Sequence, residues 1–322
     1  FPDSEVTREA VFINDRIYLN DVTTAVLGAR YDSYDQKAKT DALHARNNIF
    51  GHEVIPRSDS QVSMKVGLIR DISGDMSLFL QYAEGYRNPN FDEAYNTYTN
   101  LAQMYTIIPN PDITAETSEG FEIGLRGSLS NTSWSLAYYK NDYKDFIAYE
   151  YLFPPIQGVL QVQYQNLGSV ETNGVEFESK TVFNDNFSAS FGLSLNEGKE
   201  DDGYLDSLSP DHAKISLSWI SDSGRLRWNT NSTLMKSSRS TLSPVCGRSG
   251  ICSPAQETAG RVTLDTYLNF DITKKVNIKF GVRNLTDVKY WDYPTVAGQA
   301  EGTADEYLMP GRNMSFSIKY TL

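Results

Sequence analysis

A strict alternation of apolar and polar residues runs through most of the 322-residue chain and restricts its fold more than any other feature. In the last segment, the apolar residues are Met314, Phe316, Ile318, Tyr320 and Leu322. Polar residues fill the positions between them, and residues 187–196 and 276–283 repeat the pattern. Successive side chains of a β-strand point to opposite faces, so this period predicts strands that are apolar on one face only.

The same pattern predicts an all-β chain, because no segment shows a convincing period of 3.6 residues. We expect about thirteen strands, with boundaries that carry the usual error of sequence-based assignment. They fall at residues 6–19, 22–34, 61–71, 76–86, 117–128, 132–147, 172–183, 187–197, 212–221, 226–236, 262–273, 276–285 and 314–322.

The connections between these strands alternate between short and long. Short turns are expected near residues 20–21, 73–75, 129–131, 184–186, 222–224 and 273–275. Long polar segments lie between them, at 35–60, 87–116, 148–171, 198–211, 237–261 and 286–313. Short turns at one end of the strands and long loops at the other are typical of an antiparallel transmembrane β-barrel of the bacterial outer membrane.

The polar face of the expected strands carries many charges. They include Glu122, Arg126, Glu176, Glu178, Lys180, Lys214, Arg227, Asp265, Asp271, Lys279 and Arg283. Regularly spaced charges need water or a polar partner, which the wide interior of a barrel supplies. A soluble β-solenoid would instead place them on its outer face, but solenoids show a fixed repeat period and none is visible here.

The composition excludes some classes of function and of membrane segment. The chain has 41 acidic against 29 basic residues, a net charge of −12, which argues against a nucleic-acid partner. It has no run of about 18 apolar residues, so no transmembrane helix is expected. Cys246 and Cys252 lie in one short Gly- and Ser-rich stretch and predict a disulfide, with two free surface thiols as the alternative.

No motif for enzymatic chemistry stands out. The chain contains no Gly-rich phosphate loop, HExxH or CxxC motif and no nucleophile elbow. The nearest approach to a nucleophile beside a base is Ser209 close to His212, and we expect His212 to be structural at the start of a strand. We therefore expect that the chain is not an enzyme and holds no permanently bound cofactor.

Five segments, in order, resemble motifs of the TonB-dependent outer-membrane receptors, especially the haemoglobin, haem and transferrin/lactoferrin receptor group. The segments are LQYAEGYRNPNFDEAYN at 80–96, PNPDITAETSEGFEIGLRG at 109–127, QNLGSVETNGVEFE at 165–178, VRNLTDVKYWDY at 282–293 and MPGRNMSFSIKY at 309–320. In the first, Tyr86, Arg87, Asn88 and Pro89 stand at the positions of the family's "F-R-A-P" motif. The resemblance covers nearly the whole chain.

The resemblance implies a 22-stranded barrel with an N-terminal plug, of which residues 1–322 supply about the last thirteen strands. The plug, the segment that contacts TonB and the early strands would lie outside this sequence. Such a protein spans the outer membrane and draws energy from the TonB–ExbB–ExbD complex. Barrels of this type usually end in Phe or Trp, whereas this chain ends in Leu322, which leaves open whether Leu322 is the natural C-terminus.

The resemblance also suggests where a ligand binds. Haem receptors of this group usually carry an iron-ligating His between the first two motifs, and Gln103 occupies that position here. Methionine thioether and tyrosine phenolate are known axial ligands of haem iron, so Met104 or Tyr105 is a candidate substitute, with simple loop packing as the alternative. No firm metal site is expected.

Other candidate residues lie in the same outer loops. Arg87 can pair with a carboxylate such as Glu93 or Asp112, and together with Asn110 it helps to shape loop 87–116 or to bind ligand. His44 and His52 can face a haem or a metal, although we favour solvent exposure for both. Tyrosines suit a flat ligand through stacking, with the aromatic belt of barrels at the membrane interface as the alternative role. The loop tyrosines are Tyr95, Tyr98, Tyr105, Tyr149, Tyr151, Tyr204, Tyr290, Tyr293 and Tyr307.

Four functions remain open at this stage. The first is energy-coupled import of haem, including haem taken from a host haemoprotein, and the second is import of a ferric siderophore. The third is a passive porin, which generally has fewer strands and shorter outer loops. The fourth is an outer-membrane hydrolase, which lacks a convincing nucleophile and base.

Overall fold

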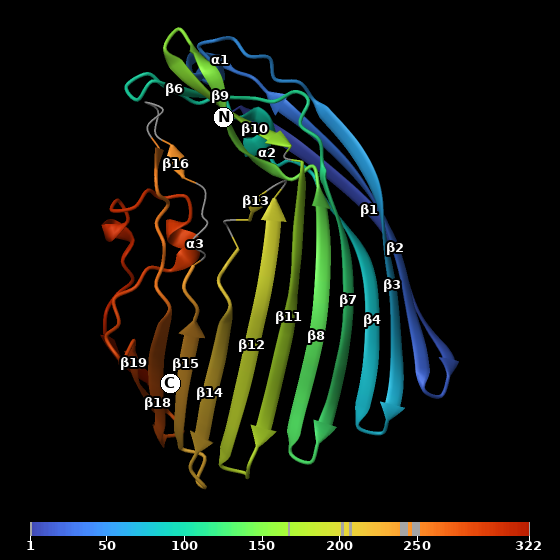
Figure 1. Cartoon of the computed structure of the whole chain (residues 1–322), viewed down its shortest axis with the longest axis vertical. Coiled ribbons are helices and arrows are strands. Elements are labelled where there is room, and N and C mark those ends of the chain that lie inside the picture. Colours follow the sequence, from blue (N-terminus) through green and yellow to red (C-terminus); the bar gives the residue numbers. More distant parts are fainter. Residues whose placement is uncertain are drawn as a thin grey trace.

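The computed structural model describes residues 2–166, 168–200, 203–205, 208–238, 244–246 and 252–321. Within these residues the chain forms one tall, curved antiparallel sheet with smaller elements gathered at one end (Figure 1). Leu322, which raised the question of the natural C-terminus, lies outside the described residues.

Thirteen strands follow one another along the large sheet in the described part of the chain, and each pairs antiparallel with the next. They are β1 (Asp3–Asn20), β2 (Thr23–Lys39), β3 (Arg57–Ser73), β4 (Met76–Arg87), β7 (Glu116–Leu129), β8 (Thr132–Lys144), β11 (Ser169–Val182), β12 (Phe187–Glu200), β14 (His212–Ile220), β15 (Leu226–Met235), β18 (Arg261–Thr273), β19 (Val276–Arg283) and β20 (Asn313–Tyr320). A two-residue strand, β13 (Gly203–Tyr204), pairs with β12 beside this path. The expected all-β antiparallel fold is confirmed.

The alternation of short and long connections is also confirmed. All the short turns lie at the lower end of the sheet in Figure 1, and the long segments lie at the upper end. Several strands extend further toward the long connections than the sequence pattern predicts: β2 runs to Lys39, and β3 begins at Arg57. Their sequences there are polar on both faces, so the hydrophobic alternation ends before the backbone pairing does.

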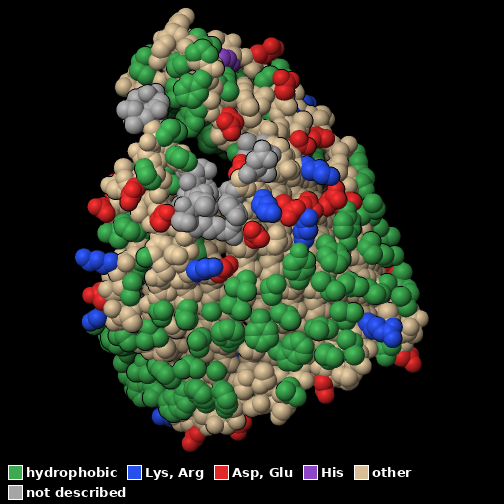
Figure 2. Space-filling view, viewed as in Figure 1, with side chains coloured by type: hydrophobic (Ala, Val, Ile, Leu, Met, Phe, Trp, Pro, Cys, Tyr) green, Lys and Arg blue, Asp and Glu red, His purple; other side chains and the backbone are tan. Residues whose placement is uncertain are grey.

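Cross-strand register places the apolar side chains on one face. In the C-terminal strands, Leu268 pairs with Phe280, which pairs with Phe316. Near the N-terminus, Leu80 pairs with both Leu68 and Ile123. Figure 2 shows the result as a broad hydrophobic band across the lower strands, with most charged side chains above it or along its borders. Such a band of outward-facing apolar residues is the lipid-contacting surface of a membrane barrel.

The opposite face is polar. Arg126, Ser135, Glu178, Gly192 and Lys214 occupy one directly paired row across five neighbouring strands. One residue's shift of register would exchange the two faces, so the pairing is strongly specified. The charges that the sequence assigned to an enclosed interior therefore lie on the face opposite the apolar band.

A second sheet lies at the end of the long connections. Its strands, in the order β5 (Thr99–Asn100), β6 (Tyr105–Ile108), β10 (Val159–Asn166) and β9 (Ile147–Ile156), come from the loop between β4 and β7 and the loop between β8 and β11. We call it the loop sheet. A long connection was expected at 148–171 without strands of its own, and β9 and β10 form a hairpin within it. A further hairpin, β16 (Val245–Cys246) and β17 (Cys252–Ser253), is closed by the predicted Cys246–Cys252 disulfide.

Four short helical elements complete the described residues. They are α1 (Ala42–Asn47), α2 (Phe91–Tyr95), α3 (Tyr293–Val296) and the 3₁₀ helix η1 (Asp305–Tyr307). All lie in the long connections, and none is long enough to show a period in sequence, which is why none was predicted. In the part of the chain that the structure describes, no helix has the length and apolar character needed to cross a membrane.

Candidate ligand-binding site

The loop sheet forms one wall of a cavity of about 710 Å³ at the end of the long connections. This volume lies within the range of typical small-molecule sites. Among the described residues the lining is mainly aromatic and aliphatic, and its members are Gln103, Tyr105, Ile107, Tyr149, Tyr151, Phe153, Leu160, Val162, Cys246 and Cys252.

Strand alternation explains which side chains reach the cavity. In β6, Tyr105 and Ile107 line it, whereas the intervening Thr106 is buried on the other face. The same rule brings Leu160 and Val162 from β10 and the aromatic series from β9 to one surface. A parallel ladder pairs Leu160 with Tyr105 and Val162 with Ile107, which fixes these side chains next to one another.

Two stacked tyrosines connect the loop sheet to α2. The rings of Tyr149 and Tyr164 stack with their centroids 3.9 Å apart, and the Tyr164 hydroxyl donates to Asp92 Oδ2 at 3.1 Å. Burial raises the pKa of both phenols, so both stay protonated near neutral pH. Tyr149 thus presents a rigid neutral aromatic surface to the cavity.

The disulfide hairpin supplies a wall from a distant part of the sequence. Cys246 and Cys252 line the cavity opposite residues that precede them by more than eighty positions. The disulfide joins the two short strands β16 and β17, so the sulfur-bearing wall is held as one unit.

An ion-pair network holds the loop that contains β5 and β6. Arg87 Nη1 lies 2.9 Å from Glu93 Oε2, and the same guanidinium pairs with both oxygens of Glu116. Glu93 also caps α2 by accepting from the Asn90 backbone N–H at 2.8 Å. Glu116 accepts from the backbone N–H of Ile147, at the start of β9. The network therefore ties the base of one loop to the base of the other.

The predicted site residues divide into two groups. Gln103 and Tyr105 line the cavity, and Met104 lies between them with a left-handed backbone (φ 54°) and an exposed side chain. Arg87, Asn110 and Asp112 are not among the lining residues. Arg87 pairs with Glu93 and Glu116 rather than with Asp112, and Asn110 Nδ2 donates to the Tyr164 carbonyl at 2.8 Å.

The outer-loop histidines differ from the expectation of solvent exposure. His44 is only 3% exposed, and its Nε2 lies 3.0 Å from Thr97 Oγ1, so the expectation is wrong for this residue. His52 is half-buried. Burial lowers the pKa of both imidazoles, and neither lines the cavity. His212 does begin a strand, β14, as expected.

Tyr95 and Tyr98, from the same loop as Tyr105, also lie outside the cavity lining. Tyr95 is 2% exposed and donates its hydroxyl to the Gln36 carbonyl at 2.8 Å, which makes it an internal support of α2. Tyr98 is exposed, and its ring centroid lies 6.1 Å from that of Tyr105. In the described residues, no cluster of three or more His, Cys, Asp or Glu has the arrangement of a metal site.

Sequence reasoning missed part of the lining. It singled out Tyr105, Tyr149 and Tyr151 as loop tyrosines. It did not predict that they line one site together with Phe153 and the aliphatic residues of β10. The signal was present, because Tyr149, Tyr151 and Phe153 alternate with other residues at the strand period. No local signal places the disulfide hairpin against the loop sheet.

Comparison with protein families gives one match over most of the chain. The family described as "TonB dependent receptor-like, beta-barrel" matches residues 1–285. Among curated relatives, "Hemoglobin-haptoglobin utilization protein B" of Neisseria meningitidis serogroup A / serotype 4A is 24% identical over 95% of this chain and 42% of its own length. The "Probable hemoglobin and hemoglobin-haptoglobin-binding protein 4" of Haemophilus influenzae is 24% identical over 80% of this chain and 29% of its own. The chain thus spans less than half the length of these relatives.

Solved structures share the fold. The "Copper transporter OprC" superposes with a TM-score of 0.75 at 16% identity, covering 99% of this chain and 50% of that one. The FrpB iron transporter of Neisseria meningitidis superposes with a TM-score of 0.74 at 16% identity, covering 98% of this chain and 45% of that one. At such identities the likeness establishes the architecture alone.

Proposed function

The chain belongs to the TonB-dependent receptor-like β-barrel family of the bacterial outer membrane, and on that premise we propose that the full-length protein binds haem at the aromatic cavity of the loop sheet and imports it. Haem is the transported substrate in this proposal. The protein holds no permanent cofactor, and its activity is capture and transport rather than catalysis.

The observation that carries the proposal is the chemistry of the cavity. Tyr105, Tyr149, Tyr151 and Phe153 surround a space of about 710 Å³ together with aliphatic side chains of β6 and β10. A flat, largely apolar ring system gains both burial and face or edge contacts with aromatic side chains in such a space. A porphyrin meets this description.

Tyr105 is the residue that we assign to the iron. A tyrosine phenolate is an established axial ligand of haem. Tyr149 is less suited because burial raises the pKa of its phenol. Met104 is the alternative ligand, but its side chain is exposed and outside the lining, so it would have to turn into the cavity.

The names of the relatives support a haemoprotein as the source of haem. Both curated relatives cited above are named for haemoglobin and its complex with haptoglobin. We therefore propose a host haemoprotein as an extracellular partner, and the TonB–ExbB–ExbD complex as the energy source acting on a region outside residues 1–322.

A ferric siderophore is the second candidate substrate. Many such chelates are anionic and are recognised by Lys or Arg through charge-assisted hydrogen bonds. The described residues that line the cavity include neither Lys nor Arg. This apolar lining suits the flat face of the porphyrin, whose two anionic propionates, like the charges of a chelate, would have to lie outside the described lining.

Titration of the full-length protein with haemin tests the proposal. We expect a saturable shift of the Soret band that changes in position and weakens in the Tyr105→Phe variant. Tyr138→Phe is the matched control, because Tyr138 lies on the apolar face of β8, away from the cavity. An unshifted Soret band together with tight binding of a ferric catecholate would transfer the assignment to a siderophore receptor.

A further inference from the structure

Tyr164 lies on the face of the loop sheet that lines the aromatic cavity, although it is not one of the lining residues. In β10, Leu160 and Val162 line the cavity, and strand alternation places Tyr164 on the same face. The antiparallel ladder between β9 and β10 sets Tyr164 directly opposite Tyr149. On this side, the row of lining side chains therefore ends at a pair of tyrosines.

The ring of Tyr149 is supported by this neighbour. The two ring centroids are 3.9 Å apart with an angle of 30° between the ring planes, which is a stacked arrangement. Tyr149 is 46% exposed, and β9 pairs with no strand other than β10 in the described part of the chain. An exposed side chain without such a contact samples several rotamers, so the stack on Tyr164 restricts how the Tyr149 ring faces the cavity.

Tyr164 is itself fixed through both its backbone and its hydroxyl. Asn110 Nδ2 donates to the Tyr164 carbonyl at 2.8 Å, and the Tyr164 hydroxyl donates to Asp92 Oδ2 at 3.1 Å. The other oxygen of Asp92 accepts from Asn96 Nδ2 at 2.7 Å, which restricts the orientation of the carboxylate. A hydrogen bond to an ionised carboxylate is stronger than one between neutral groups, so Asp92 is an effective partner for the Tyr164 hydroxyl.

Asp92 belongs to a helix that is fixed to the large sheet. It lies in α2, and Figure 1 shows this helix beside β10 at the end of the long connections. The next residue, Glu93, pairs with Arg87 at the end of β4, and Tyr95 donates its hydroxyl to the Gln36 carbonyl of β2 at 2.8 Å. The hydrogen bond from the loop sheet therefore ends on a helix that two strands of the large sheet hold in place.

We propose that Tyr164 and Asp92 are positioning residues of the ligand site: the hydrogen bond between them holds the Tyr164 ring, and the stack on that ring holds Tyr149 in the orientation that contacts the ligand. Neither residue touches the ligand, because neither lines the cavity. Binding costs less when the aromatic surface is already ordered, so losing the hydrogen bond should weaken binding without removing a ligand contact. This inference rests on the proposed binding of haem at the aromatic cavity.

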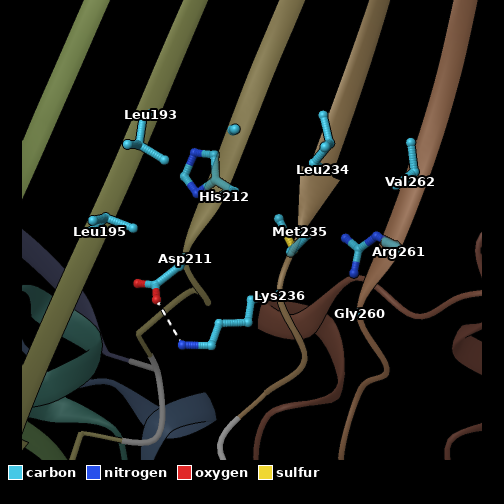
Figure 3. A pocket seen from close by; sticks show the side chains of 11 residues that line it. Leu193, Leu195, Asp211, His212, Leu234, Met235, Lys236, Gly260, Arg261 and Val262 are labelled. Atoms are coloured by element: carbon cyan, nitrogen blue, oxygen red, sulfur yellow. Dashed lines mark hydrogen bonds and ion pairs between the residues drawn. The ribbon is translucent and has the colours of Figure 1, made fainter.

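Hydroxyl-radical footprinting of the ligand-free, full-length protein tests the support of Tyr149. A tyrosine ring is modified faster when it becomes more accessible, so Tyr164→Phe should increase the modification rate of Tyr149. Met235 is the internal reference, because it lies in a separate cavity formed by β12, β14, β15 and β18 (Figure 3) that shares no lining residue with the aromatic cavity. Its rate should be the same in both proteins. An unchanged rate at Tyr149 would overturn the proposal.

Haemin titration tests the effect on the ligand. Tyr164→Phe keeps the ring and removes one hydrogen bond, and it should raise the dissociation constant for haemin about fivefold. The induced circular dichroism of the Soret band arises from coupling between the porphyrin and nearby aromatic rings, so its shape should change in this variant. A general loss of stability would lower the occupancy without changing that shape.

Tyr82→Phe is the matched control for the loss of the hydroxyl. Tyr82 also donates to a carboxylate oxygen, Glu84 Oε1, at 3.1 Å, and it lies on the same face of β4 as Leu80, outside the cavity lining. Its affinity for haemin and its Soret dichroism should match those of the unaltered protein. A dissociation constant that Tyr164→Phe leaves equal to that of Tyr82→Phe would count against the positioning role alone.

A double-mutant cycle shows whether Asp92 acts through Tyr164. Asp92→Ala should weaken haemin binding, and adding it to Tyr164→Phe should weaken binding no further. Asp92→Asn should restore much of the affinity, because its amide nitrogen can donate to the Tyr164 hydroxyl oxygen. Additive losses in the double variant would overturn the proposal. If the unaltered protein binds no haemin, the proposed function fails, and the footprinting of Tyr149 alone decides the positioning role.

Discussion

Arg87, the last residue of β4, donates through Nη1 to both carboxylate oxygens of Glu93, at 3.0 and 2.9 Å. Glu93 has a 10% exposed side chain and caps the helix that begins the loop bearing β5 and β6. With Glu116 on the same guanidinium, two nearly buried carboxylates depend on one cation. The sequence left open whether Arg87 shapes loop 87–116 or binds ligand, and the geometry makes it a support of the loop.

Replacing Arg87 with Gln should loosen the loop without unfolding the barrel. Two carboxylates would lose their charged donor, and we expect the local opening free energy of residues 88–115 to fall by about 1–3 kcal/mol. Hydrogen–deuterium exchange should show faster exchange there and unchanged exchange in β7 and β8. Lys144→Gln, which breaks a more exposed pair, is the control. Protection in 88–115 equal to that of the unaltered protein would contradict this role.

Opening the disulfide should weaken ligand binding while the barrel keeps its stability. The bond closes a loop with a sequence separation of 6, for which chain-entropy reasoning gives about 2 kcal/mol of local stabilisation. Because the hairpin lines the aromatic cavity and is remote from the short turns, a Cys246→Ser, Cys252→Ser double variant should raise the dissociation constant for haemin. Its thermal unfolding should match that of the unaltered protein. A lowered unfolding temperature with unchanged haemin affinity would reverse this assignment.

Acid should loosen the segment around α1. Burial lowers the pKa of His44 below its ordinary value of 6.5, so the open form binds a proton more readily than the closed form. The neutral imidazole's stabilisation is complete above pH 6.5 and is lost as the pH falls through the lowered pKa of the closed form. Limited proteolysis of residues 40–53 should therefore accelerate as the pH falls from 7.5 to 5.

The His44→Gln variant is the control for this prediction. It should reduce the pH dependence of proteolysis to the part contributed by His52, whose pKa is also lowered. A pH response that His44→Gln leaves unchanged would exclude His44 as its cause.

Two glycines of the large sheet should respond differently to the same substitution. A Cβ at Gly124 would lie 2.6 Å from the Leu136 carbonyl oxygen and would also overlap the Phe79 ring, whereas a Cβ at Gly192 would meet nothing within 4 Å. Overpacking of this kind costs about 1–3 kcal/mol. We expect Gly124→Ala to lower the unfolding midpoint in detergent and Gly192→Ala to leave it nearly unchanged. Equal midpoints for the two variants would show that the sheet adjusts at Gly124 without cost.

The large sheet was predictable from sequence because each of its strands carries its own evidence. Phe316, for example, is an apolar residue between two serines. The alternation around it is enough to predict which face of the strand is apolar and how the strand aligns with its neighbours. The binding cavity was harder to predict from the sequence. Tyr105 and Tyr151 come from different loops, and they meet only because β6 and β10 pair in parallel, a contact between residues more than fifty positions apart. The burial of His44 likewise depends on Thr97, which no pattern around residue 44 identifies.

The parallel ladder of β6 and β10 has a mechanical consequence. Main-chain hydrogen bonds join the two long connections into one sheet, and the hydrogen bonds of Asn110 and Tyr164 hold the edge of that sheet. Neither connection can move alone without breaking the hydrogen bonds between β6 and β10. Entry of the proposed ligand from this side would therefore require the two connections to move together, about the ends of β4 and β8 and the beginnings of β7 and β11.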